Sequence, residues 1–472
     1  LWRRFDLPAL KYCSAALAVV SSIRLLLLPE VFSYAVGDIP IFNLLLVGYL
    51  APAAAFWFAA RTFERGGLGD KARIVQALEG GAIALFSVFV TLEIRHFLNG
   101  GDIGAGAFSL TEASLQTLNW LSIAAFMRWR FGEALSAVRR FAEIGLLGAA
   151  GAVTLFYSLI YANPAFGYDP QPIGGLPVLN SLLLYYLAPA LGFAAAAFAS
   201  RRSGLKIQSR MLGAASAVVG ASWLTLAIRH VFQAPYLAQG EIGLHEGAAL
   251  ASAWTLVAAT AGYRFMRPDR VVVIWSFRIL LILAAAMIGL IGVIGANPWW
   301  GVDPQPIGGP PFINLLAFDY LAPAFGFVAA AWAAGRAGHA RIAKAGAYFA
   351  ALLGLLWLIL VVRHLFHAPQ LNAGFIGLGE SWSYSAAIII YAAGLLIVGA
   401  LRRLRLVSVA GFAALMLAAF KVFIFDMGGL EGVWRASAFL GLGATLIGIA
   451  VLYQRTAAGK AGRDGLLNSR PS

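Results

Sequence analysis

Apolar residues follow one another in long runs along this chain, without the strict alternation of polar and apolar positions that marks barrel strands. A transmembrane helix needs about 20 predominantly apolar residues. Applied along the sequence, this measure predicts fourteen spans, which begin near residues 11, 40, 75, 112, 145, 177, 209, 244, 272, 311, 343, 380, 407 and 433. The pattern therefore predicts an all-α fold, a polytopic transmembrane helical bundle with short loops.

The composition agrees with a membrane protein. Hydrophobic residues make up 61% of the 472 positions and charged residues only 12%, against roughly 45–50% and roughly 25% in soluble domains. The single cysteine, Cys13, excludes a disulfide within the chain and any cysteine-based metal cluster. Nothing in the residue pattern requires a cofactor or a metal ion.

One apolar segment recurs three times. The stretch LPVLNSLLLYYLAPA at 176–190 matches PPFINLLAFDYLAPA at 310–324 and, more loosely, IPIFNLLLVGYLAPA at 39–53. Such self-similarity indicates repeated structural units, and we expect three four-helix repeats. The predicted segments are a lead-in at 1–10, repeats at 11–131, 144–265 and 272–403, a two-helix segment at 406–455 and a disordered tail at 456–472.

Positive charge lies in alternate loops. Nearly all of the 35 Lys and Arg residues fall in one alternate set of loops and at the two ends of the chain. The positive-inside rule makes these loops and both ends cytoplasmic and the motif loops periplasmic. Because each repeat has an even number of helices, the repeats are parallel, unlike the inverted repeats of many transporters. The net charge of +14 reflects this distribution and attraction to anionic lipid, and we find no nucleic-acid module.

The heptapeptide DPQPIGG occurs at 169–175 and again at 303–309, each time headed by an aspartate, Asp169 or Asp303. Proline biases the backbone toward extended and turn conformations, and Gly-Gly lets it fold back. Turn chemistry accounts for every residue type, so we interpret the heptapeptide as a rigid outer-face turn. A ligand-binding loop is the alternative.

An Arg-His pair ends the third helix of each repeat, and a glutamate opens the fourth helix seventeen residues after the arginine. The three sets are Arg95, His96 and Glu112; Arg229, His230 and Glu246; and Arg363, His364 and Glu380. Charges at this depth are expensive unless paired, so the first interpretation is an ion pair that fixes the outer helix ends. The alternative is an outer vestibule in which the histidines relay protons or hold a metal ion. His367 in the outer loop is expected to be solvated.

Asp319 departs from the repeat, because Tyr185 stands at the matching place in the second repeat. It is expected about two turns inside a span, near Asn314 and Tyr320 on the same helix. A lone carboxylate inside a membrane is by default a functional-site hypothesis, and a buried structural acid is the alternative. His245 is a further unit-specific polar residue with a weaker claim.

The last predicted helix pair stands outside the repeats and contains Lys421, Asp426 and Arg435. Asp426 and Arg435 flank a tight turn and are expected to pair across it. The run FKVFIFDMGGLEGVWRASAFLGLGATLIGIAVLYQR resembles the C-terminal signature of the domain-of-unknown-function 2339 family of predicted membrane proteins. The resemblance implies a bacterial inner-membrane protein with an upstream region of the same polypeptide, and it implies no reaction.

Three classes of function follow from the sequence. Transport or conduction of a small solute, ion or lipid-linked molecule is the leading hypothesis. The alternatives are a membrane-embedded enzyme acting on lipid or envelope glycan at the periplasmic face, and a structural membrane scaffold. The expected partners are the lipid bilayer and either further copies of the chain or envelope proteins. Convergence of polar residues on one cavity would discriminate among the three.

Overall fold

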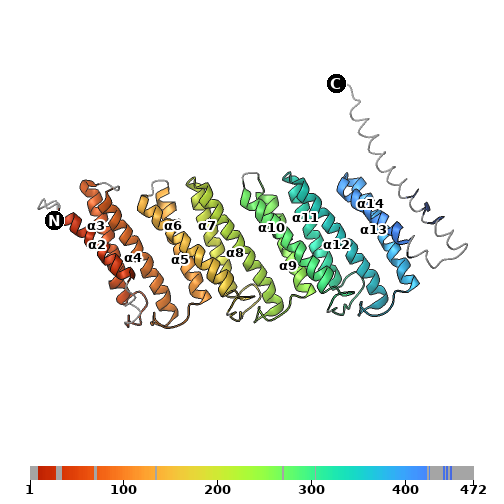
Figure 1. The fold of residues 1–472 in the computed structure, drawn as a ribbon, viewed down its shortest axis with the longest axis horizontal. Coiled ribbons are helices and arrows are strands. Elements are labelled where there is room, and N and C mark those ends of the chain that lie inside the picture. Colours follow the sequence, from red (N-terminus) through yellow and green to blue (C-terminus); the bar gives the residue numbers. More distant parts are fainter. Residues whose placement is uncertain are drawn as a thin grey trace, which may run out of the picture. The chain divides into compact units, whose positions relative to one another are not determined.

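The computed structural model describes residues 9–27, 35–68, 72–132, 136–168, 170–267, 270–302 and 304–422, together with 425, 440, 441, 443, 444, 447 and 448. The chain divides into two compact units, Leu1–Gly240 and Glu241–Ser472. Within the described residues it forms thirteen α-helices, which confirms the all-α class (Figure 1).

Short π-helical segments adjoin several of the α-helices. The first unit contains α2 (Ala9–Leu27), α3 (Ala51–Phe63), α4 (Arg73–Leu98), α5 (Leu110–Phe131), α6 (Ala137–Ala152), α7 (Ala188–Arg202) and α8 (Lys206–Gln233). The second contains α9 (Leu244–Phe265), α10 (Val271–Met287), α11 (Ala322–Arg336), α12 (Ala340–His367), α13 (Leu378–Arg402) and α14 (Arg405–Lys421). The π-helical segments are Leu46–Leu50, Glu64–Leu68, Val153–Tyr161, Leu183–Leu187, Ile288–Gly295 and Ala317–Leu321.

Among the described residues, nine helical stretches are long and apolar enough to cross a membrane. They are Leu46–Gly66, Arg73–Leu98, Ala137–Tyr161, Leu183–Arg202, Lys206–Gln233, Val271–Gly295, Ala317–Arg336, Ala340–His367 and Leu378–Arg402. The chain is therefore a polytopic membrane protein whose spans contact lipid. The larger number of fourteen spans stays a prediction, and most of the span expected near residue 433 lies outside the described residues.

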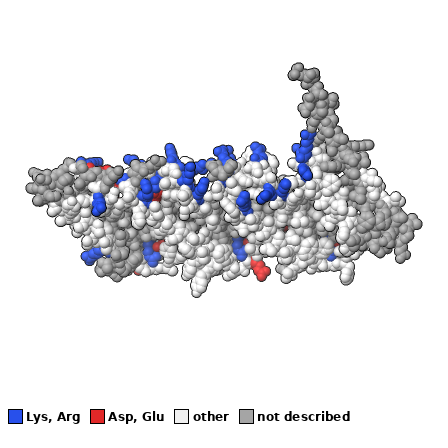
Figure 2. Space-filling view, turned by 45° about the horizontal axis from the view of Figure 1, so that its top comes forward, with Lys and Arg blue, Asp and Glu red and all other residues white. Residues whose placement is uncertain are grey.

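Lys and Arg side chains gather at one end of the helices in each unit (Figure 2). The short turns at that end join α3 to α4, α5 to α6 and α7 to α8 in the first unit, and α9 to α10, α11 to α12 and α13 to α14 in the second. The longer loops that carry the sequence motifs lie at the opposite end (Figure 1). Each unit thus has a basic end and a motif-bearing end.

Three helices begin later than the apolar pattern indicates. The pattern predicts spans from about residues 40, 177 and 311, whereas helical structure starts at residues 44, 182 and 315. The side-chain oxygens of Asn43, Asn180 and Asn314 accept hydrogen bonds of 2.8, 3.0 and 3.0 Å from the backbone N–H two residues on. Asparagine is a preferred helix N-cap, so the prolines before these positions stay in the preceding turn.

A π-helical turn follows each asparagine cap and leads into α3, α7 or α11, each of which has a proline at its start. Proline has no N–H to donate to the carbonyl four residues earlier. A wider π-helical turn accommodates such a break in the α-helical hydrogen bonding. Before α11 the affected carbonyl belongs to Asp319, four residues ahead of Pro323. The proline therefore disturbs the helix at the residue that the sequence singled out.

The buried core lies between helices within each unit. In the first unit, Tyr186, Phe193 and Leu226 belong to one buried cluster between the α7 region and α8. In the second unit, Leu396 and Ala414 join α13 to α14. A Cβ atom at Gly411 would lie 3.0 Å from the backbone nitrogen of Leu396. Glycine therefore permits the close approach of these two helices.

Candidate functional site

Asp319 and His245 form a hydrogen-bonded pair in the second unit. His245 Nδ1 lies 2.8 Å from Asp319 Oδ1. The Asp319 residue is 0% exposed, whereas the His245 side chain is 32% exposed. Asp319 Oδ2 is also buried and has no hydrogen-bond partner among the described residues. The carboxyl group is therefore out of contact with water, yet its partner reaches the surface.

The fold places this pair near the motif-bearing end of the second unit. His245 is the second residue of α9, and Asp319 is the third residue of the candidate span Ala317–Arg336. Because Asn314 caps the helix only at residue 315, Asp319 lies nearer the helix end than the apolar run alone indicates. The ring of His245 can therefore connect a buried carboxyl to the surface at the motif-bearing end.

The first unit has a neutral pair at the matching place. Thr111 precedes His245 by 134 positions, as Tyr185 precedes Asp319. The hydroxyl oxygens of Thr111 and Tyr185 lie 3.2 Å apart. The same contact between two helices is thus made once by two hydroxyl groups and once by an imidazole and a carboxyl. Only the second version can take up and release a proton near neutral pH.

The two residues expected near Asp319 have structural contacts of their own. Asn314 caps its helix and also donates from Nδ2 to the carbonyl of Pro311 at 3.4 Å. The Tyr320 hydroxyl donates to the carbonyl of Gly292 at 2.7 Å and accepts from Asn297 Nδ2 at 3.2 Å. Tyr186 makes the matching bond to the carbonyl of Ser158 at 2.7 Å. The bonds of Tyr320 and Tyr186 each tie two helical segments together.

The expected pair of Arg95 and Glu112 is present. Arg95 Nη1 donates to both carboxylate oxygens of Glu112 at 3.1 and 2.9 Å. The other guanidinium nitrogens donate to the backbone carbonyls of Ile103, Ala105 and Gly106 at 2.7, 3.1 and 3.0 Å. One arginine therefore holds the helix that follows and the loop in between.

Arg363 repeats this arrangement with greater burial. Its Nη1 donates to Glu380 Oε1 at 2.9 Å, and both side chains are 2% exposed. The guanidinium also donates to the carbonyls of Leu371, Ala373 and Gly374, at 2.7, 2.8 and 2.9 Å. The ring of Trp299 covers it at 5.1 Å from ring centroid to guanidinium carbon. The expected ion pair is present here as well.

Arg229 makes the same type of loop contact within the first unit. It donates from Nε to the carbonyl of Leu237 and from Nη2 to the carbonyl of Gly240. Its expected partner Glu246 belongs to the second unit. The pairing of Arg229 with Glu246 stays a prediction.

The three histidines of the sets are buried rather than gathered in an open vestibule. His96, His230 and His364 are at most 2% exposed. Their Nε2 atoms lie 2.6, 3.0 and 3.1 Å from the carbonyl oxygens of Gly37, Ile173 and Ile307. A carbonyl only accepts, so Nε2 carries the hydrogen. Each histidine thereby ties its helix end to the loop that precedes α3, α7 or α11.

The structure places His367 in a cluster that sequence reasoning missed. His367 Nε2 lies 2.8 Å from Glu380 Oε2, and the Tyr384 hydroxyl donates to Glu380 Oε1 at 2.7 Å. The His367 side chain is 18% exposed. The expectation that His367 is solvated is therefore wrong, because a buried carboxylate accepts from it. Its spacing of thirteen residues before Glu380 was the available signal.

Lys421 lies at the end of α14 and reaches α13. Its Nζ donates to the carbonyl of Ser381 at 2.8 Å, to Ser381 Oγ at 3.2 Å and to Ser385 Oγ at 2.8 Å. The other predicted site residues, Asp169, Asp303, Asp426 and Arg435, lie outside the described residues. In the part of the chain that is described, no group of three or more His, Cys, Asp or Glu side chains is arranged to hold a metal ion.

Comparison with known proteins agrees with the membrane class. The chain matches the family model described as "Predicted membrane protein (DUF2339)" over residues 1–267 and 248–456. The chain belongs to this family. The match extends the resemblance of the C-terminal run to nearly the whole sequence. No curated protein and no solved structure matches the chain.

Proposed function

We propose that this DUF2339 protein transports a small solute, an ion or a lipid-linked molecule, and that His245 and Asp319 form its protonatable centre. The observation that carries the proposal is a fully buried carboxyl paired with a partly exposed imidazole, at a place where the first unit has two neutral hydroxyls. Ionisable groups inside membrane spans are costly, and they commonly mark substrate or proton pathways.

The geometry suggests how such a centre works. The partly exposed ring of His245 can exchange a proton with water at the motif-bearing end. Its Nδ1, which lies against Asp319 Oδ1, can pass a proton to the carboxyl or take one from it. The second carboxyl oxygen, Asp319 Oδ2, is buried without a described partner. A charged carboxylate is poorly tolerated in such surroundings, whereas a protonated or cation-bound one is tolerated. We propose that protonation of this oxygen, or binding of a cation to it, is coupled to transport.

We further propose that the chain consists of three parallel four-helix repeats in a bacterial inner membrane, with the basic turns cytoplasmic and the motif loops periplasmic. The recurring contacts of Arg95, Arg229 and Arg363, each with the carbonyl eight residues on, support the repeats. The positive-inside rule supports the orientation. In this proposal the Arg-His/Glu sets are clamps on outer loops, because nearly all their bonds go to backbone carbonyls or to each other.

The experiment is a solute and lipid profile of a deletion strain complemented with variants of the gene. Wild type is expected to restore the profile, and Asp319→Asn and the double variant His245→Thr/Asp319→Tyr are expected to fail. The double variant copies the neutral pair of the first unit. It therefore separates the loss of a titratable group from the loss of a helix contact.

A matched control changes the neutral pair instead. Thr111→Val/Tyr185→Phe removes the corresponding hydrogen bond and is expected to restore the profile. Membrane levels of every variant are compared by immunoblot. If the neutral copy at His245 and Asp319 restores everything that wild type restores, the pair is a structural contact and the proposal is wrong.

A further inference from the structure

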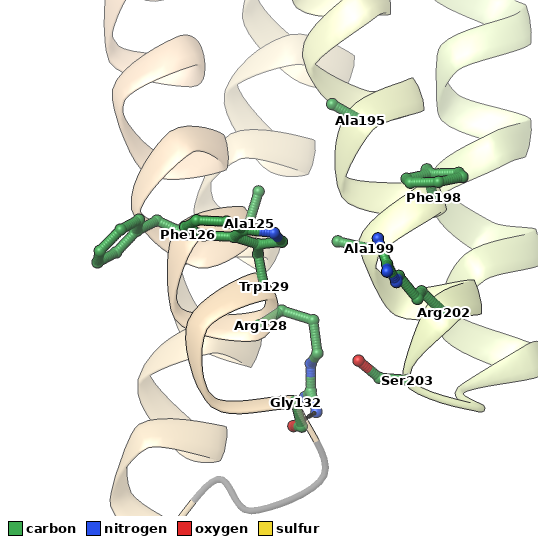
Figure 3. A pocket seen from close by; sticks show the side chains of 10 residues that line it. All are labelled: Ala125, Phe126, Arg128, Trp129, Gly132, Ala195, Phe198, Ala199, Arg202 and Ser203. Atoms are coloured by element: carbon green, nitrogen blue, oxygen red, sulfur yellow. Dashed lines mark hydrogen bonds between the residues drawn. The ribbon is translucent and has the colours of Figure 1, made fainter.

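A cavity opens between α5 and α7 at the basic end of the first unit (Figure 3). Its volume is about 700 Å³. Five residues of α5 and its C-cap and five of α7 and its C-cap line it, namely Ala125, Phe126, Arg128, Trp129, Gly132, Ala195, Phe198, Ala199, Arg202 and Ser203. Ala195 and Phe198 lie toward the middle of the helices, and Arg128, Gly132 and Ser203 lie toward the helix ends (Figure 3). The Arg202 side chain turns back along α7 toward Ala199.

The second unit has a stack of side chains at the matching place. Tyr263, Trp332 and Arg336 each stand 134 positions after Trp129, Phe198 and Arg202. The rings of Tyr263 and Trp332 stack across α9 and α11 with centroids 5.2 Å apart and an interplanar angle of 16°. The Arg336 guanidinium covers them at 5.4 and 5.1 Å from the two ring centroids.

The first unit does not form this stack. The ring of Trp129 lies near that of Phe126 on its own helix, with centroids 6.1 Å apart. Arg202 is exposed and has no ion pair, hydrogen bond or ring contact among the described residues. Trp129, Phe198 and Arg202 therefore line an open space instead of filling it with one another.

A buried polar group forms one wall of the cavity. Arg128 is 3% exposed and forms a double hydrogen bond to Glu143, while Glu143 Oε1 also accepts from Gln208 Nε2 at 2.8 Å. Arg128 Nη1 donates to the carbonyl of Gly132 at 3.0 Å. Arginine has five N–H donors, so two remain for a bound group.

This polar wall is also specific to the first unit. Gly262 and Phe277 stand 134 positions after Arg128 and Glu143. A Cβ atom at Gly262 would lie 2.7 Å from the Phe277 ring, which shows that the ring fills this space. One helix junction is thus closed by apolar packing and an internal cation–aromatic stack, while the other keeps a cavity with buried donors.

We propose that the α5–α7 cavity binds the headgroup of an anionic phospholipid. The phosphate accepts hydrogen bonds from Arg202, Ser203 and the remaining N–H groups of Arg128, and the acyl chains lie along the apolar side chains above them. Arginine suits phosphate recognition because its planar fork presents several donors. Trp129 lies in the last turn of α5, and tryptophan is enriched at membrane interfaces.

The lining favours a lipid over a soluble phosphate. Phe126 and Phe198 are 57% and 66% exposed, so the lining includes apolar surface that water solvates poorly. The cavity opens between α5 and the candidate span Leu183–Arg202, at the end of the unit where Lys and Arg gather. Basic pockets between membrane helices attract anionic headgroups. A lipid supplies both the negative charge and the apolar part that this lining matches.

The test is lipid titration of the purified full chain in detergent, followed by native mass spectrometry. Phosphatidylglycerol and phosphatidylcholine are the two lipids compared. Wild type is expected to bind one phosphatidylglycerol about tenfold more tightly than phosphatidylcholine, which corresponds to about 1.4 kcal/mol. Arg202→Gln is expected to remove this preference.

A second variant tests the cavity itself. Trp129→Tyr/Phe198→Trp copies the stacked residues of the second unit, and we expect it to displace the lipid without loss of thermal stability. Arg336→Gln is the matched control, because Arg336 already stacks on its own aromatic residues, and it is expected to keep wild-type lipid binding.

Three results would overturn the proposal. The first is equal affinity for the two lipids in wild type. The second is wild-type phosphatidylglycerol binding in both Arg202→Gln and the stacked copy. The third is competition by soluble glycerol phosphate at the concentration of lipid that saturates the site, since this would mean that the apolar lining contributes nothing.

Discussion

The hydroxyl oxygens of Thr111 and Tyr185 lie 3.2 Å apart at the helix contact where, 134 positions later in the chain, His245 Nδ1 lies 2.8 Å from Asp319 Oδ1. The fold therefore accommodates a neutral pair and a titratable pair in the same geometry. The neutral pair shows that no charge is needed to join these helices. The cost of changing the titratable pair should then depend on whether a buried group is left without a partner.

The first prediction concerns this cost. His245→Ala is expected to destabilise the protein by about 1–3 kcal/mol, because it leaves the Asp319 carboxyl buried without its partner. The double variant His245→Thr/Asp319→Tyr is expected to stay within about 1 kcal/mol of wild type, since it copies an existing contact. Thermal unfolding in detergent measures both. A double variant less stable than His245→Ala would contradict the prediction.

The second prediction compares two clamps that differ in burial. Arg363→Gln removes the guanidinium from the buried Glu380, which keeps only His367 and Tyr384, and is expected to cost about 3–5 kcal/mol. Arg95→Gln should cost less, because the Arg95 side chain is 19% exposed and that of Arg363 is 2% exposed. Thermal unfolding gives the order, and limited proteolysis reports loop release. Equal small losses in both variants would show that the carbonyl contacts do not hold the loops.

The third prediction uses the buried pair of Arg128 and Glu143. Arg128→Gly alone leaves a buried carboxylate, with an expected cost of about 3–5 kcal/mol. Adding Glu143→Phe copies the Gly262 and Phe277 packing of the second unit and is expected to recover more than half of that loss. A double-mutant cycle by thermal unfolding measures the coupling. Additive losses would indicate that the two positions are not exchangeable between units.

The fourth prediction concerns orientation. In a Cys13→Ser background, a cysteine is introduced at Ala105 in the loop before α5 or at Ala340 at the start of α12, both of which are exposed. The positive-inside rule predicts that a membrane-impermeant maleimide labels position 105 in spheroplasts and position 340 only after lysis. The reverse pattern would place the motif loops in the cytoplasm.

Apolar runs were sufficient to predict the order of the helices, because burial in lipid demands long hydrophobic segments. They were insufficient to place helix starts, since the asparagine caps at 43, 180 and 314 act through side-chain geometry that hydropathy does not report. The pairing of Asp319 with His245 had a signal in the sequence. Both residues depart from the repeat. His245 stands at the position that matches Thr111, and Asp319 stands at the position that matches Tyr185.

The cavity between α5 and α7 had no comparable signal. Trp129, Phe198 and Arg202 have the same chemical character as Tyr263, Trp332 and Arg336. One trio stacks and the other does not, and this depends on side-chain rotamers and helix spacing. The replacement of Gly262 and Phe277 by Arg128 and Glu143 was visible in the register, but its consequence for the space between the helices was not.

The arginine clamps bind carbonyl oxygens, which every residue type carries. The loop segments NGGDIGAG at 99–106 and HAPQLNAG at 367–374 share only their final Ala-Gly, yet Arg95 and Arg363 hold both through backbone atoms at the same three positions. Selection can thus retain the arginine and its glutamate while the loop side chains between them drift. In evolutionary terms, one shared frame permits each motif-bearing surface to acquire its own chemistry.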